Sequence, residues 1–286
     1  IILNNANAFT GAVALNTTGS SGNATVVDAS SLNLGSSTVG GNLIATATTG
    51  NMTDSGALTI TGTSSFTTSA NNATIVLAWD RPWTNAFTGE VTITTNDNSG
   101  TDADVYIDGG TTALVIATSN IDGDLILRSG HASGITDSGT VTVGGGFAVI
   151  TDANNGVINL DTLAVANGMA LITHGSGNAT VVNHAGFYFT RINSAVGGNL
   201  SVTATTGNIT NNAPSVTIAG TSSFTTSADN ATITLNNANA FTGAVSLNTT
   251  GSSGNATVVD ASGLNLGAST VGGNLIATAT TGDMED

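Results

Sequence analysis

Apolar and polar residues alternate along most of the chain, in short runs that are bounded by Gly, Asn, Asp and Ser. Val13 and Leu15 alternate with Ala and Asn, and Val91 and Ile93 alternate with Glu and Thr. A period of two with β-branched residues and flanking turn residues predicts β-strands. Because no segment keeps a helical period, we expect an all-β protein.

Long stretches of the sequence recur. Residues 2–52 return almost unchanged at 234–284, and GNATVV stands at 22–27, 177–182 and 254–259. Near-identical copies at a fixed spacing favour a solenoid over hairpins, because each copy then stacks on the next. The repeat unit is about 77 residues long, and its three and a half copies occupy approximately residues 1–73, 74–156, 157–231 and 232–286, the last copy being partial.

A shorter period lies inside each copy. A Gly followed by alternating apolar residues recurs from Gly11 to Gly273, at intervals of about 21–34 residues. We take each interval as one turn, and stacked turns would let every strand pair with the strands above and below it. The sequence therefore predicts a right-handed parallel β-helix of about 11 turns, forming a single continuous β-solenoid over residues 1–286.

Charge and composition narrow the range of functions. The chain has 18 acidic residues against 3 basic ones, all of them Arg, and a formal net charge of −15. We expect no nucleic-acid binding, because phosphate contacts need Lys and Arg. No apolar run reaches the length of about 18 residues that a transmembrane helix requires. The chain has no Cys, so disulfides contribute nothing to its stability.

The segment NAFTGAVALNTTGSSGNATVVDASSLNLGSSTVGGNLIATATTG, residues 7–50, carries the motifs F-x-G-x-V-x-L, GNATVVDA and GGNL. These motifs resemble the repeats of filamentous haemagglutinin-like giant bacterial surface proteins, which are adhesins. The resemblance implies a parallel β-helix, secretion to the extracellular cell surface, and adhesion, aggregation or sheath building. It carries no catalytic residues. We therefore expect a structural or adhesive segment that forms a stalk, fibre or sheath through self-association, with host or neighbouring-cell glycans as further partners.

The second copy carries an insertion that is a candidate ligand-binding loop. It reads LAWDRPWTNAF at 77–87, where the first and fourth copies read LNNANAF. Aromatic side chains on a protruding loop could stack on a sugar or anchor a partner. We name Trp79, Arg81 and Trp83 as candidate glycan-binding residues. The alternative is a loop that folds back over an apolar gap.

Six acidic residues of the second copy are candidate calcium ligands. Closely spaced carboxylates in turns suit Ca²⁺, which takes six to eight oxygen ligands. The spacing matches neither an EF-hand nor a nonapeptide calcium repeat, and Asp also serves as a turn residue and as an edge-protecting charge. The candidate metal ligands are Asp97, Asp102, Asp104, Asp108, Asp122 and Asp124.

Two further functions are disfavoured. His131, His174 and His184 lie in unrelated contexts, and the chain has no Lys and only scattered Arg, so we expect no enzyme, including one that cleaves polysaccharides. Ice binding would use Thr-x-Thr steps, such as Thr92–Thr94, as outward ladders. The unequal lengths of the predicted turns argue against the alignment of such ladders.

Overall fold

The computed structural model describes residues 1–77, 84–96, 103–190 and 192–286. Within these residues the regular secondary structure consists of short β-strands, and no helix is present. The described part of the chain accordingly has no helix that could cross a membrane. The chain divides into two compact units, Ile1–Gly146 and Phe147–Asp286, and each is described by itself.

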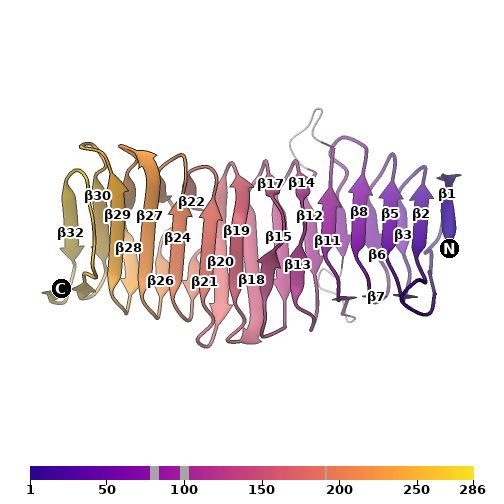
Figure 1. Ribbon diagram of the computed structural model, residues 1–286, viewed down its shortest axis with the longest axis horizontal. Helices are drawn as coiled ribbons and strands as arrows, with labels where there is room; N and C mark the ends of the chain where they lie inside the picture. The colour runs from indigo at the N-terminus through magenta and orange to yellow at the C-terminus, as the bar shows by residue number, and fades with distance from the viewer. Residues whose placement is uncertain (78–83, 97–102, 191) are drawn as a thin grey trace. The chain divides into compact units, whose positions relative to one another are not determined.

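The strands of the first unit lie side by side in Figure 1, from indigo to magenta, and pair in parallel. The main sheet contains β1 (Ile2–Asn7), β2 (Ala24–Asp28), β5 (Leu43–Ala47), β8 (Ser64–Thr68), β11 (Val91–Thr94), β13 (Leu114–Ile116), β14 (Ser119–Ile121), β16 (Ile135–Asp137) and β17 (Val141–Val143). A second sheet contains β3 (Leu32–Leu34), β6 (Met52–Asp54), β9 (Ile75–Leu77), β12 (Val105–Asp108) and β15 (Leu125–Ser129). A small third sheet contains β4 (Ser37–Val39), β7 (Leu58–Ile60) and β10 (Ala86–Phe87).

The second unit is built in the same way, again from parallel pairs. One sheet contains β19 (Ile158–Val165), β21 (Ala179–Asn183), β24 (Leu200–Ala204), β27 (Ser222–Asp229) and β29 (Val245–Thr250). The other contains β18 (Phe147–Asn154), β20 (Gly168–His174), β22 (Phe187–Phe189), β23 (Ser194–Val196), β25 (Ile209–Asn211), β26 (Val216–Ile218), β28 (Ile233–Phe241), β30 (Ala256–Asp260) and β32 (Leu275–Ala279). Two short strands near the end, β31 (Leu264–Asn265) and β33 (Met284–Glu285), pair with each other.

Register confirms the predicted all-β parallel β-solenoid. Ala24 pairs with Leu43 and Ile75 pairs with Val105, so each pair encloses one turn. The first of these turns is slightly shorter than any Gly interval. The interval from Gly11 to Gly41 is not one turn, because the Gly41 N–H donates to the Gly22 carbonyl at 3.1 Å. The same local pattern of Gly and apolar residues occurs in strands of different sheets. The pattern alone therefore does not show which Gly-started segments lie on top of one another.

The core consists mainly of alternate side chains from the strands between β2 and β31. In β5, for example, Leu43, Ala45 and Ala47 are buried while the residues between them face outward. Phe189 and Phe224 pack edge to face with ring centroids 6.2 Å apart, and Phe224 packs on Phe241 at 6.0 Å. Edge-to-face contacts stabilise aromatic pairs beyond the burial of their area. The core side chains of one turn therefore pack against those of the turns above and below it.

One repeat unit does not correspond to a whole number of solenoid turns. In the first unit, the column β2–β5–β8–β11 climbs three turns within one sheet. The next copy begins with β12, the counterpart of β2, and β12 pairs with β9 and β15 in the other sheet. In the second unit, the counterparts β21 and β30 likewise belong to different sheets. One repeat therefore advances by about three and a half turns.

Candidate functional site

The predicted loop of Trp79, Arg81 and Trp83 lies outside the described residues. What the structure does describe is its base. Leu77 is fully buried before the loop, and Asn85 is buried after it. The Asn85 side-chain amide donates to an Asp54 carboxylate oxygen at 2.9 Å. Both ends of the insertion are therefore fixed to the solenoid, and its ligand binding stays a prediction.

Two of the predicted calcium ligands belong to a ladder of hydrogen bonds along one corner of the solenoid. Asp104 Oδ1 accepts the N–H of Asp124 at 2.7 Å, and Asp124 Oδ1 accepts the N–H of Gly146 at 2.6 Å. In the first copy Asn23 and Asn42 take the same positions, with Asn42 Oδ1 accepting the N–H of Thr63 at 3.0 Å. The two Asp residues therefore form, at the start of β12 and β15 in the second sheet, the same kind of ladder that Asn forms at the start of β2 and β5 in the main sheet. Local spacing does not reveal this structural role.

The other predicted ligands are dispersed. Asp108 Oδ1 accepts the N–H of Gly110 at 2.7 Å and thereby caps a turn. Asp122 donates its own N–H to Thr95 Oγ1 at 2.9 Å. Asp97 and Asp102 lie outside the described residues. Among the residues that the structure does describe, no three His, Cys, Asp or Glu side chains gather in a way that could hold a metal ion. Calcium binding by the full set of six stays a prediction.

Two further carboxylates are buried at the ends of strands. Asp28 and Asp260 are fully buried at the ends of β2 and β30. Asp260 accepts the N–H of Phe241 at 2.8 Å and both the N–H and the hydroxyl of Ser262, at 2.8 and 2.9 Å. Asn183 takes this place in the third copy and accepts the N–H of Val165 at 2.9 Å. Because an amide serves as well as a carboxylate, these groups act as turn caps.

Outward residues of the main sheet form two ladders of mostly Ser and Thr, which we call the Ser/Thr face. In the first unit the ladders are Thr25–Ile44–Ser65–Thr92 and Val27–Thr46–Thr67–Thr94. In the second unit they are Thr180–Ser201–Ser223–Ser246 and Val182–Thr203–Thr225–Asn248. None of these residues is charged, so each unit carries an uncharged strip two residues wide.

Unequal turns do not disturb the Ser/Thr face, contrary to the expectation from turn length. The step from Thr67 to Thr94 is longer in sequence than the step from Thr46 to Thr67, yet all three residues are in register. The paired strands keep their alignment although the connections between them differ in length. Sequence intervals report the length of corners as well as strands, which explains the difference.

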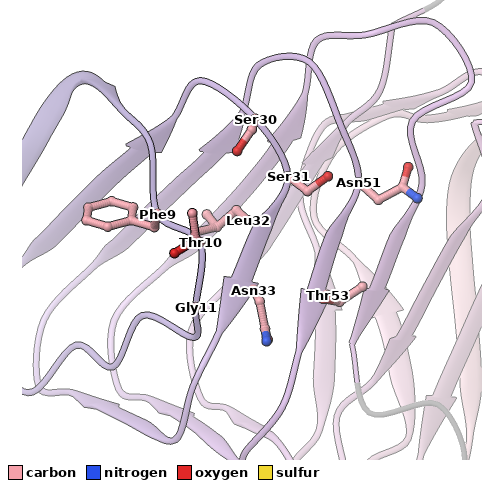
Figure 2. A pocket seen from close by; sticks show the side chains of 9 residues that line it. All are labelled: Phe9, Thr10, Gly11, Ser30, Ser31, Leu32, Asn33, Asn51 and Thr53. Carbon is pink, nitrogen blue, oxygen red and sulfur yellow. The ribbon is translucent and has the colours of Figure 1, made fainter.

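An open groove borders the outer surface of β3 and β6 (Figure 2). Its volume is about 570 Å³. Its lining comes from the corner that holds Thr10, from the residues around Leu32 and from the start of β6, as Figure 2 shows. The lining residues that matter here are Thr10, Ser31, Leu32, Asn33, Asn51 and Thr53. Sequence reasoning missed the groove, because its residues are ordinary turn and strand residues until the fold brings them together.

Comparison with known proteins gives a family but no function. A family described as repeats of unknown function (DUF5649) matches residues 21–94, 176–248 and 253–286, which together make up more than half of the chain. The stretch between the first two matches holds most of the divergent second copy. No curated protein and no solved structure matches the chain. The chain therefore belongs to the DUF5649 family of repeats.

Proposed function

We propose that this chain is a structural segment of a secreted bacterial surface protein, and that it builds a fibre, stalk or sheath by self-association. The observation that supports this most directly is the Ser/Thr face. It is regular, carries no charge and is made mostly of short side chains, on a protein whose formal net charge is −15. The proposed partner for this face is the Ser/Thr face of a second copy.

Electrostatics favours this face as the place of contact. Copies of a strongly acidic protein repel one another through their net charge. Two Ser/Thr faces bring no ionised groups into direct contact, and their hydroxyls can donate and accept hydrogen bonds across an interface. Salt screens the remaining repulsion, because the Debye length falls to about 8 Å at physiological ionic strength. Self-association is therefore expected to strengthen with added NaCl.

The half-integral repeat supports lateral assembly. Counterpart strands of consecutive copies lie in different sheets, as β21 and β30 do in the second unit. In a longer row of such copies, corresponding strands would therefore belong to the main sheet in one copy and to the second sheet in the next copy. Each chain would thus offer equivalent contacts in more than one direction, as a sheath or bundle requires.

Charges placed on the Ser/Thr face test the proposal. The double variant Thr46→Glu/Thr67→Glu should remain monomeric by analytical ultracentrifugation at NaCl concentrations where the unaltered chain associates. The matched control is Thr111→Glu/Asn212→Glu, which adds the same charge at two exposed residues away from the face. This control should associate like the unaltered chain. Equal association of all three proteins would contradict the proposal.

Contacts through the exposed strand β32 need a separate control. Ile276 of β32 is 60% exposed, so open sheet edges could also drive association. The variant Ile276→Lys blocks that route and leaves the Ser/Thr face intact. Under the proposal, Ile276→Lys still forms lateral assemblies in electron micrographs. Their loss in this variant would assign association to the sheet edge instead.

An extracellular location belongs to the same proposal. It is supported by the resemblance of residues 7–50 to filamentous haemagglutinin-like repeats. Immunogold labelling of intact cells of the source organism, with an antibody raised against this chain, should decorate the cell surface. Labelling only after permeabilisation would contradict it.

A further inference from the structure

The groove of Figure 2 has a counterpart in the second unit. Thr242, Leu264 and Asn265 line the second groove, and they are the repeat counterparts of Thr10, Leu32 and Asn33. The second groove has a volume of about 320 Å³. Thr242 belongs to one matched repeat and Leu264 to the next, and Thr10 likewise precedes the repeat that holds Leu32. We call these two sites the junction grooves, because both lie where one repeat passes into the next.

One polar atom in the first groove lacks a partner. The side-chain oxygen of Asn33 is buried and accepts no hydrogen bond from any described residue. Buried polar atoms in native proteins are nearly always satisfied, so this oxygen is an acceptor with unused hydrogen-bonding capacity beside the groove. The hydroxyls of Thr10, Ser31 and Thr53 border the same groove and can supply further hydrogen bonds.

The two intervening copies carry larger or apolar residues where the groove has Asn33. The third copy has Tyr188 between Phe187 and Phe189, where the first copy has Asn33 between two Leu residues. The Tyr188 hydroxyl lies over Gly186, 2.7 Å from where a Cβ on that glycine would stand. The second copy has Val115 at this position. The fold thus does not impose a polar groove on every copy.

We propose that the junction grooves bind neutral oligosaccharides. The first groove is lined by hydroxyl and amide groups together with Phe9, and none of the residues that line it is charged. Small-molecule sites combine apolar surface with a few directed polar groups, and sugars offer hydroxyls that both donate and accept. The net charge of −15 disfavours polyanionic glycans.

The strands at the first groove are unsuited to capturing a peptide by strand addition. β3 pairs with β6 and, through Leu34, with Val13, while β6 also pairs with β9. Peptide capture by strand addition needs an unpaired edge.

The second groove has Asp283 and Glu285 where the first has Asn51 and Thr53. These carboxylates can accept hydrogen bonds from sugar hydroxyls.

The chain's own Tyr188 suggests the test. An array of neutral and anionic oligosaccharides is probed with the full chain, and the best neutral hit is titrated by calorimetry. The double variant Asn33→Tyr/Asn265→Tyr should fill both grooves and weaken binding at least tenfold. Asn212→Tyr, which adds the same side chain at an exposed residue outside both grooves, should bind like the unaltered chain. Circular dichroism of each variant establishes that the fold is kept.

A second pair of substitutions separates the grooves from the predicted tryptophan loop. Trp79→Ala/Trp83→Ala should keep full affinity for the same oligosaccharide. The proposal would be overturned if the unaltered chain bound no neutral oligosaccharide of the array. It would also be overturned by undiminished binding in the double Tyr variant, or by binding that is lost only with the two Trp residues. Failure of this proposal leaves self-association through the Ser/Thr face unaffected, because the two use different residues.

Discussion

Ser64 and Ser222 occupy the same inward position in two copies of the repeat, at the start of β8 and of β27. Both are buried, and the hydroxyl of each has no hydrogen-bond partner among the described residues. Their neighbours in register are apolar: Leu43 and Val91 flank Ser64. A buried hydroxyl without a partner is destabilising by the desolvation that it does not recover.

Replacement of both inward serines should therefore stabilise the protein. Each of Ser64→Ala and Ser222→Ala should raise the free energy of unfolding by about 1 kcal/mol. The change is measured as a higher guanidinium chloride midpoint. The outward neighbours provide matched controls, and Ser65→Ala and Ser223→Ala should change the free energy by less than about 0.5 kcal/mol. Lower midpoints for the inward variants would show that the hydroxyls have partners after all.

At the scale of elements, the ladder of Asn side chains at the start of the main-sheet strands helps successive turns keep one register. Asn199 Oδ1 accepts the N–H of Thr221 at 2.9 Å, and Asn178 Oδ1 accepts that of Asn199 at 2.8 Å. Each side chain thus satisfies a backbone donor in the turn above, where the corner interrupts the sheet. At this corner, where no strands pair, the ladder's hydrogen bonds link each turn to the next.

Removal of one ladder side chain should be costly, whereas an exchange of amide for carboxylate should not. Asn199→Ala leaves the Thr221 N–H without its partner and should lower the free energy of unfolding by about 1–2 kcal/mol. Asn199→Asp should cost far less, because Asp124 performs this role towards Gly146 in the second copy. Chemical denaturation of the two variants checks the comparison. Equal losses for both would mean that the hydrogen bond is not what the side chain contributes.

Strands and their inward residues could be predicted from the sequence because a period of two is a local property. Their parallel stacking could be predicted because near-identical copies recur at a fixed spacing. Val13 and Leu43 both follow a Gly in the same local pattern, yet Val13 pairs with Leu34 and Leu43 pairs with Ala24. The assignment of a strand to a sheet depends on how many residues each corner holds, which no local pattern records. The roles of Asp104 and Asp124 were missed for the same reason, since the ladder exists only between turns.

At the scale of the whole molecule, the repeat of about three and a half turns determines how each unit presents its surfaces. It separates the strands of consecutive copies into different sheets, and it places the junction grooves where one repeat passes into the next. The continuity of residues 1–286 as one solenoid stays a prediction, since each unit is described by itself. Both proposals depend on this stacking pattern within the units.

The stacking pattern can be tested by disulfide formation, because the chain has no cysteine of its own. Thr234 and Thr257 are partners in register between β28 and β30, and both face outward. A repeat of whole turns would instead place Thr257 above Ser246 of β29. Parallel partners lie within the Cα separation of about 4.4–6.8 Å that a disulfide needs. Under mild oxidation, Thr234→Cys/Thr257→Cys should cross-link within the monomer and Ser246→Cys/Thr257→Cys should not; the reverse outcome would contradict the half-turn repeat.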